Sequence, residues 1–414
     1  MEMLKDKDQN TSFNAIHFLI CSLIIGVTII SFPTNGLTYT IVRLVQAIEL
    51  LILAVLFLPR FQLVMKVNKF NLFVNIWWLG YVLNTFLHPT NVGITPVFTW
   101  LNVAIFLLIG KIFWKDNMRD TLKTLATIFS FLVYLNGILL ILFPEGLWID
   151  PEWVGRGSDV RYLFGNQNQT GLVCIFAVTT QCLYTFAYNK GRFNLFLLVV
   201  VSAVSILFLG SMTSTIGIAL ITLYIVFNRF FKRPYLLLVI FTIIYLAVFL
   251  LIVWFGNDIE GVKWLTTFVE VTLNKDTTFS RRTIIWENAV ALIRQQPLLG
   301  YGIQNVDWND SHLGGSGTHN LWVMLLMNSG FIGCISFIFI LIHSVRNALT
   351  VRLKITTAAV MALCVLLIMS FFEAYSIIYI FLFLQIVYYS ANIPIQANTP
   401  PQTQENTTTS NLNS

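Results

Sequence analysis

The sequence contains few charged residues. Only 11% of its 414 residues are Asp, Glu, Lys or Arg, whereas 57% are hydrophobic and 14% are aromatic. An ordinary soluble domain has about 25% charged residues, so this composition excludes that class of protein. Apolar runs of about 18–22 residues recur along the chain, and that length crosses the hydrocarbon core of a bilayer. The composition therefore predicts a polytopic membrane protein.

Cysteine is scarce, and patterns of metal ligands are missing. The cysteines lie in apolar runs without ligand spacing or a disulfide framework, at Cys21, Cys174, Cys182, Cys334 and Cys364. We expect them to be small core residues. Carboxylates and histidines are not clustered with ligand spacing either, so we predict no metal and no cofactor. The net charge of +6 does not indicate nucleic acid, because the basic residues sit in short loops.

Twelve apolar runs are long enough, or nearly so, to span a membrane. The first follows a polar stretch at 1–12 and is too long for a signal peptide, with no cleavage site after it, so we interpret it as a retained span. The sequence predicts an all-α polytopic protein of about twelve transmembrane helices. The runs are 13–30, 37–58, 70–87, 96–113, 122–143, 171–188, 193–209, 215–231, 235–255, 320–343, 356–372 and 375–389.

Lysine and arginine are concentrated in alternate loops, which predicts the orientation. The opposite short loops, at 31–36, 88–95, 210–214 and 373–374, contain neither residue. By the positive-inside rule both termini are cytoplasmic, and the loops 144–170 and 256–318 face outside. We thus expect helices 1–9 in 1–255, a large external loop in 256–318, helices 10–12 in 319–390 and a disordered cytoplasmic tail in 391–414.

The large external loop contains a predicted amphipathic helix with two adjacent arginines at its start. Arg282, Trp286, Ala289 and Ile293 share one face of this helix. Packing on the membrane surface explains the apolar residues, and long loops tolerate positive charge. Packing on the membrane surface does not explain why Arg281 and Arg282 lie at the positive end of the helix dipole. A guanidinium in that place is suited to bind a phosphate or pyrophosphate.

His319 follows a glycine-rich segment and is predicted to begin the next helix, with Thr318 as its cap. Positions 319, 323, 326, 330 and 333 form one stripe of that helix, and Gly330 and Gly333 would let a neighbouring helix approach. A lone histidine is more often structural. Here the helix start disfavours the imidazolium, so the neutral ring is a candidate general base. Asp307 and Asp310 are candidates to orient it.

Two further polar segments are weaker candidates. Arg161 precedes the sequence Gly165-Asn166-Gln167-Asn168, which is typical of a tight turn before a helix, although asparagine amides also bind sugar hydroxyls. Arg43 repeats with Gln46 and Glu49 at three-residue steps inside the second predicted span. Charges within a membrane usually face a cavity or each other, which favours a structural polar seam there.

Together these motifs resemble the O-antigen ligase and O-antigen/capsular polysaccharide polymerase superfamily of bacterial envelopes. The resemblance lies in His319-Asn320 followed by Gly330 and Gly333, in Arg282 and Trp286 followed by 297–302, and in Arg161 with 165–168. The segment 210–214 is similar to the Gly/Ser-rich start of a span in that family, but it lacks the arginine often found there.

The resemblance implies a GT-C-like architecture and metal-independent glycosyl transfer at the outer face of the bacterial cytoplasmic membrane. The donor would be an oligosaccharide on undecaprenyl pyrophosphate. His319 would be the catalytic base, and Arg282 and Arg161 would bind the pyrophosphate. Arg281 stands where the family often has a small residue, so both adjacent arginines are candidates. The supporting residues implied are Asn320, Asn166, Asn168, Trp286 and Arg43.

Three functions fit this resemblance or compete with it. A polymerase would use a second lipid-linked repeat unit as acceptor, and we favour it because nothing in the sequence is directed at lipid A. A ligase would transfer the glycan to another acceptor. A lipid-linked oligosaccharide flippase or transporter would place its polar residues near mid-membrane on broken helices, not in external loops. The expected partners are the bilayer, the lipid-linked donor, a chain-length regulator and a flippase.

Overall fold

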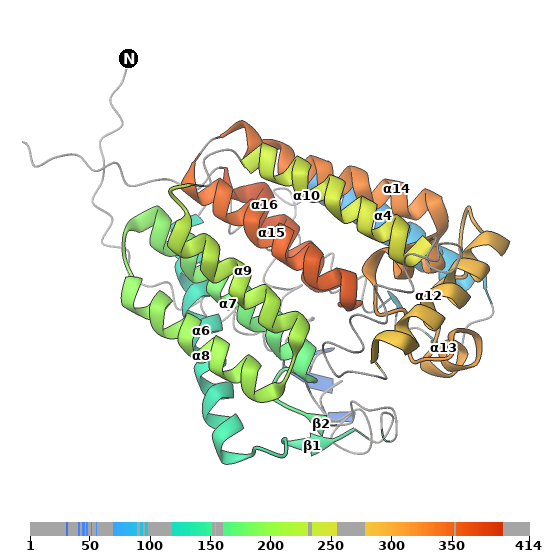
Figure 1. Cartoon of the computed structure of the whole chain (residues 1–414), viewed down its shortest axis with the longest axis horizontal. Helices are drawn as coiled ribbons and strands as arrows, with labels where there is room; N and C mark the ends of the chain where they lie inside the picture. Colours follow the sequence, from blue (N-terminus) through green and yellow to red (C-terminus); the bar gives the residue numbers. More distant parts are fainter. Residues whose placement is uncertain are drawn as a thin grey trace, which may run out of the picture.

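The computed structural model describes residues 30–31, 69–88, 92–93, 96–97, 118–150, 154, 160–230, 234–254, 278–351 and 353–391, with scattered positions between 40 and 55. The predicted spans at 13–30, 37–58 and 96–113 lie wholly or largely outside these residues, as do Arg43 and the predicted tail. Within the described part, helices form a bundle with one short hairpin at its end (Figure 1).

The helices of the bundle agree closely with nine of the predicted runs. They are α4 (Lys69–Phe86), α6 (Met118–Leu142), α7 (Gln167–Tyr188), α8 (Arg192–Leu209), α9 (Met212–Phe227), α10 (Pro234–Val248) continued by a π-helical segment (Phe249–Trp254), α14 (Leu321–Thr350), α15 (Lys354–Phe372) and α16 (Ile377–Ser390). Five of them, α6, α7, α8, α14 and α15, are long and apolar enough to cross a membrane. The protein is thus an all-α membrane protein, and the total of twelve spans stays a prediction.

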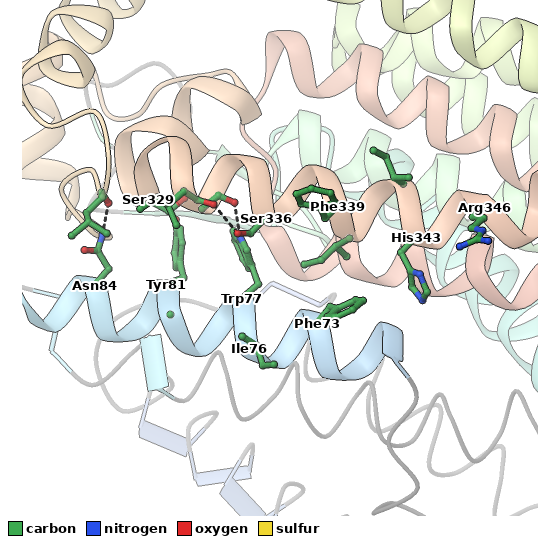
Figure 2. Close-up of a pocket in the computed structure, with 16 residues that line it drawn as sticks. Phe73, Ile76, Trp77, Tyr81, Asn84, Ser329, Ser336, Phe339, His343 and Arg346 are labelled. Atoms are coloured by element: carbon green, nitrogen blue, oxygen red, sulfur yellow. Dashed lines mark hydrogen bonds between the residues drawn. The ribbon is translucent and has the colours of Figure 1, made fainter.

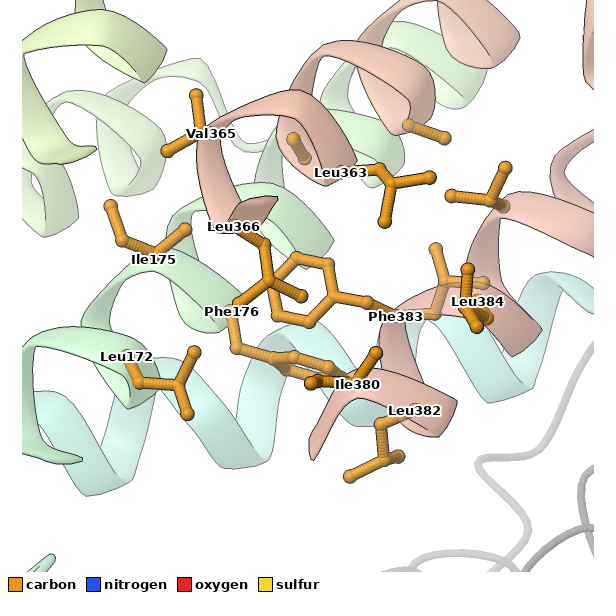
Figure 3. Packing of buried hydrophobic residues seen from close by; sticks show 14 of the residues in the cluster. Leu172, Ile175, Phe176, Leu363, Val365, Leu366, Ile380, Leu382, Phe383 and Leu384 are labelled. Atoms are coloured by element: carbon orange, nitrogen blue, oxygen red, sulfur yellow. The ribbon is translucent and has the colours of Figure 1, made fainter. Parts of the chain in front are cut away.

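The core lies around α7, α15 and α16. Phe176 of α7 packs against Phe383 of α16, with ring centroids 4.8 Å apart (Figure 3). It also packs against Phe129 of α6, with ring centroids 4.5 Å apart. Two buried threonines in α7 are satisfied within the helix, since the Thr179 hydroxyl donates to the carbonyl of Ile175 at 2.7 Å and the Thr180 hydroxyl donates to that of Ala177 at 3.0 Å. This internal bonding lets α7 be buried along almost its whole length, as an apolar surrounding requires.

Two further helices and a hairpin occupy the loops at one end of the bundle (Figure 1). The helices are α12 (Thr278–Gln295) and α13 (Val306–Leu313). The strands β1 (Trp148–Ile149) and β2 (Val160–Arg161) pair antiparallel, with Trp148 opposite Arg161. The sequence predicted α12 but neither α13 nor the hairpin, because two-residue strands leave no periodic pattern to detect.

The predicted stripe from His319 to Gly333 is wrong. Helix α14 begins at Leu321, and it is interrupted at Gly330, where φ is 58° and ψ is −167°. Only glycine adopts this backbone conformation without strain. The positions before and after Gly330 therefore do not continue one helical face.

A loop, not a helix, fills the break at Gly330. The N–H of Phe331 donates to the carbonyl of Pro297 at 2.8 Å, and the N–H of Tyr301 donates to the carbonyl of Met327 at 2.7 Å. The segment 297–302 thus supplies partners to backbone groups that the kink releases. A Cβ at residue 330 would lie 2.2 Å from the carbonyl oxygen of Leu298, so glycine is required there for space as well as for conformation.

Helix α4 closes the same region from the other side. The Trp77 indole N–H donates to the carbonyl of Gly333 at 2.7 Å, and the Asn84 amide donates to the carbonyl of Leu299 at 2.7 Å (Figure 2). The same amide donates to the carbonyl of Asn328 at 2.9 Å. The helix that neighbours Gly333 is therefore α4, which contacts the glycine carbonyl through the Trp77 side chain. These bonds hold α4, the segment 297–302 and α14 together beside the loops that contain α12 and α13.

We expect Gly330→Ala to destabilise the protein by about 3 kcal/mol or more, because it combines backbone strain with a clash against main-chain atoms. Thermal unfolding of the purified protein in detergent measures the loss. Gly80→Ala in α4 is the matched control, since a Cβ there meets nothing within 4 Å. It should leave stability unchanged or raise it by up to about 1 kcal/mol. Equal melting temperatures for Gly330→Ala and the wild type would contradict the docking role of the kink.

Candidate functional site

A polar cluster surrounds the carboxylate of Glu373 in the link 373–376 between α15 and α16. Its Oε1 lies 3.4 Å from Nδ1 of His319, and its Oε2 lies 3.7 Å from Nη2 of Arg282. The Asn168 amide also donates to Oε2 at 2.6 Å. Residues from the starts of α7 and α12, the approach to α14 and the end of α15 thus meet at one carboxylate. We call Asn168, Ser211, Arg282, His319 and Glu373 the polar cluster.

The polar cluster is partly desolvated but open. The side chain of Glu373 is 16% exposed, that of Arg282 is 21% exposed and that of His319 is 30% exposed. Charges in such a setting interact more strongly than they would in bulk water. The histidine ring remains the most accessible of the three, so it is the group that a substrate reaches most easily.

His319 lies in a strained turn before α14 and not within the helix. Its φ is 46°, in the left-handed region that few side chains adopt. The predicted cap Thr318 is wrong, because Asn320 caps the helix by accepting from the N–H groups of Trp322 at 2.9 Å and Val323 at 3.1 Å. The helix therefore starts two residues later than predicted, and the imidazole projects from the preceding turn.

Buried hydrogen bonds hold this turn beside Glu373. The Asn320 amide donates to the carbonyl of Phe371 at 3.0 Å, which ties the start of α14 to the end of α15. The Trp286 indole N–H donates to the carbonyl of Thr318 at 2.8 Å, which ties the turn to α12. Asn320 and Trp286 thus act on His319 through the backbone. Their predicted supporting role has a physical basis in these two contacts.

Helix α12 presents Arg282 to the polar cluster. Its predicted apolar face is confirmed, since Trp286, Ala289 and Ile293 are buried against α14 and the π-helical end of α10. Arg282 lies one turn before Trp286 on the same face and therefore points toward the turn that Trp286 holds. The backbone of Arg281 lies in α12, but its side chain falls outside the described residues.

Burial lowers the pKa of Arg282, and the nearby Glu373 carboxylate opposes this shift. An arginine starts from so high a pKa that it stays protonated at neutral pH. A charged guanidinium in a desolvated place is a strong site for a divalent anion. Without substrate, the ion pair between Arg282 and Glu373 is long, so an incoming phosphate oxygen can compete with Glu373 for the guanidinium.

Asn166 and Asn168 have different tasks. Asn166 caps α7 by accepting from the N–H groups of Asn168 at 3.1 Å and Gln169 at 3.0 Å, which is the turn role that the sequence allowed. Asn168 instead bridges two elements. It donates to Glu373, and its Oδ1 lies 2.7 Å from Oγ of Ser211, the residue that caps α9. Asn168 therefore holds the Glu373 carboxylate in place.

Arg161 is held by the hairpin. Its Nε lies 3.2 Å from Oδ2 of Asp150, and both side chains are almost fully buried. Removing one partner of such a pair leaves a buried charge uncompensated, so the contact has a clear structural role. The predicted contact between Arg161 and pyrophosphate stays a prediction.

The sequence analysis missed Glu373 and Ser211. For Glu373 the sequence offered its position alone, an acidic residue in the short link predicted between the last two spans. Asp307 and Asp310 were the predicted partners of His319, whereas the carboxylate that the structure places against the ring is Glu373. Among the described residues, no three His, Cys, Asp or Glu side chains gather in a group that could hold a metal ion.

Comparison with known families supports the resemblance. Residues 197–338 match the family described as O-Antigen ligase. This range runs from α8 into α14, so it includes Arg282, Trp286, His319 and the Gly330 break. Glu373 lies beyond its end. A search of curated proteins finds no match to the chain. The predicted likeness to an O-antigen ligase family is thus confirmed for this part of the chain.

Proposed function

Since residues 197–338 match the O-Antigen ligase family, we propose that the protein is a polysaccharide polymerase. It joins undecaprenyl-pyrophosphate-linked oligosaccharide repeat units at the outer face of the bacterial cytoplasmic membrane. The observation that carries the proposal is the convergence of a histidine, an arginine and an orienting carboxylate at Glu373. A base and an anion-binding group in one open site are what glycosyl transfer from a pyrophosphate requires.

The proposed reaction is one displacement at the anomeric carbon of the donor. An acceptor hydroxyl forms the new C–O bond as the bond to the pyrophosphate breaks, and His319 takes the hydroxyl proton on Nε2. Glu373 faces Nδ1 and therefore stabilises the tautomer whose Nε2 is free to accept. Arg282 neutralises the charge that accumulates on the departing undecaprenyl pyrophosphate.

An apolar groove supports a lipid-linked donor. It lies between α10 and α14, has a volume of about 790 Å³ and is lined almost entirely by hydrophobic side chains. Its lining includes Phe249, Trp322 and Leu326, which also pack against α12. The helix that carries Arg282 therefore covers one end of the groove. A polyprenyl chain in this groove would place its pyrophosphate near that guanidinium.

The distribution of charge supports an outward-facing site. At the end of the bundle opposite the polar cluster, basic residues occur between α7 and α8, after α9 and at the start of α15, namely Lys190, Arg192, Arg229 and Lys354. The positive-inside rule places that end in the cytoplasm. The same arrangement weighs against a transporter, because the polar cluster lies in links at the ends of helices and not at their middle.

We expect the purified protein, given the lipid-linked repeat unit of its host in detergent, to form a ladder of lipid-linked glycans without added metal or nucleotide. Gel separation of the labelled products measures the ladder. A single transfer to a different acceptor with no ladder would indicate a ligase. Intact substrate after prolonged incubation, together with its movement across vesicle membranes, would indicate a flippase and would overturn the proposal.

A further inference from the structure

A second cavity adjoins the polar cluster. It lies between α4, the early part of α14, the start of α16 and the segment 303–318, and its volume is about 380 Å³. That volume falls within the roughly 300–1,000 Å³ of typical ligand sites. Thr318 and Ala374 line the cavity, and they are the chain neighbours of His319 and Glu373. The cavity therefore lies one residue along the chain from both His319 and Glu373.

The lining combines aromatic rings with side-chain amides. Trp78 and Tyr81 of α4 face Gln304, Asn309 and Asn328, and we call this cavity the amide pocket. Among the described residues the lining contains no Asp, Glu, Lys or Arg. Amides both donate and accept hydrogen bonds, and aromatic faces pack against C–H groups. These are the requirements of a ligand rich in neutral hydroxyl groups.

One lining group lacks a partner within the protein. The Trp78 side chain is 3% exposed, and its indole N–H has no hydrogen-bond partner in the part of the chain that the structure describes. That N–H is enclosed and does not open into the amide pocket, so the amides and the hydroxyl of the lining supply its hydrogen-bonding groups. The neighbouring Asn328 amide is already positioned, since it donates to the Tyr81 hydroxyl at 2.6 Å.

We infer that the amide pocket binds the terminal sugars of the acceptor glycan and presents a hydroxyl to His319. The inference rests on the proposed function and adds where the second substrate binds. Arg282 and the apolar groove serve the anionic, lipid-linked donor, whereas a phosphate or an ammonium group in the amide pocket would lose its hydration without a counter-charge. A lipid chain there would leave the amides unpaired. A neutral saccharide satisfies them.

Binding of a lipid-free glycan tests the inference. The probe is the oligosaccharide repeat released by mild acid from the host's lipid-linked donor, labelled with a fluorophore and titrated with purified full-length protein. Gly317 lines the amide pocket, and a Cβ there meets nothing within 4 Å, so we choose Gly317→Leu to occupy part of the pocket. We expect it to weaken binding at least 10-fold. Asn309→Ala removes one amide and should weaken binding about 3- to 10-fold.

Matched variants separate binding from loop anchoring. Asn309 donates to the carbonyl of Ser316 at 3.3 Å, and Asn288 donates to the carbonyl of Leu313 at 3.0 Å but does not line the pocket. Asn288→Ala should bind the probe like the wild type, and so should Arg282→Ala. Melting curves must show that each variant is folded.

The outcomes distinguish this inference from the proposed function. Wild-type affinity in a folded Gly317→Leu variant, or no binding of the probe by the wild type, would overturn the inference while a glycan ladder still supported the polymerase. An Arg282→Ala variant that loses the probe as strongly as Gly317→Leu would also overturn it. Pocket-dependent binding without any ladder would retain the saccharide site and reject the polymerase.

Discussion

Replacing His319 by asparagine should slow glycan polymerisation by about 10²–10⁴-fold while leaving the fold intact, since general-base catalysis typically supplies that factor. Asparagine suits this test because it tolerates the left-handed backbone that His319 adopts at φ 46°. Its amide can still donate to Glu373, but it cannot accept a proton. The initial rate of ladder formation and the melting temperature are the two measurements.

His312→Ala is the matched control for this prediction. His312 lies seven residues earlier in the chain, is exposed, and stacks on Trp308 with ring centroids 4.1 Å apart. Its replacement should change the rate of ladder formation less than about twofold, because His312 is outside the polar cluster. The fold should also be kept, since a surface substitution usually shifts stability by under about 0.5 kcal/mol. A chelator should not slow the wild type. Near-normal turnover in His319→Asn would reject His319 as the base, and loss of activity with the chelator as well would indicate a metal-dependent mechanism instead.

The residues that could be predicted from the sequence are those that depend on local periodicity. The face of α12 with Trp286, Ala289 and Ile293 follows from a helical repeat within one segment. The break between α8 and α9 likewise follows from local signals. Gly210 adopts a φ of 68° at the end of α8, and Ser211 caps α9, so glycine and a capping residue mark the boundary directly.

The residues that could not be predicted depend on contacts between distant segments. Gly330 follows a run that is periodic enough to be read as one helix, and only the docking of Pro297 and Leu298 shows why the helix breaks there. Glu373 gains its role from His319 and Arg282, which are 54 and 91 residues earlier in the chain. Periodicity within a segment carries no information on which loops meet at the end of a bundle.

Arg161 is a residue for which the sequence suggested a ligand and the structure shows a partner within the protein. Its charge in an external loop allowed an anionic ligand, and the family resemblance implied pyrophosphate, whereas the structure pairs it with Asp150, opposite in charge and only 11 residues earlier. The pairing depends on the β1–β2 hairpin, which gave no signal in the sequence. A charge that violates the positive-inside rule therefore has two explanations, a ligand or a buried partner, and the choice requires the tertiary contacts.

Arg282→Ala should weaken use of the lipid-linked donor by roughly 10- to 150-fold, which corresponds to the loss of about 1.5–3 kcal/mol from a hydrogen bond to a charged group. Arg282→Lys should recover only part of this loss, because an ammonium cannot form the bidentate contact of a guanidinium. Steady-state kinetics at varied donor concentration measures the effect. Arg294→Ala is the control, since Arg294 is exposed in the last turn of the same helix.

A double-mutant cycle separates the donor role of Arg282 from its ion pair with Glu373. Arg282→Ala leaves the Glu373 carboxylate without this cation, so part of its effect arises from repulsion of the anionic donor by that carboxylate. Glu373→Gln removes the repulsion, and it also removes the negative charge beside Nδ1 of His319. We therefore expect Arg282→Ala to weaken donor binding less in the Glu373→Gln background than alone, whereas catalysis falls in both. Unchanged donor affinity in folded Arg282→Ala would instead restrict Arg282 to holding Glu373 and would move pyrophosphate binding to another residue.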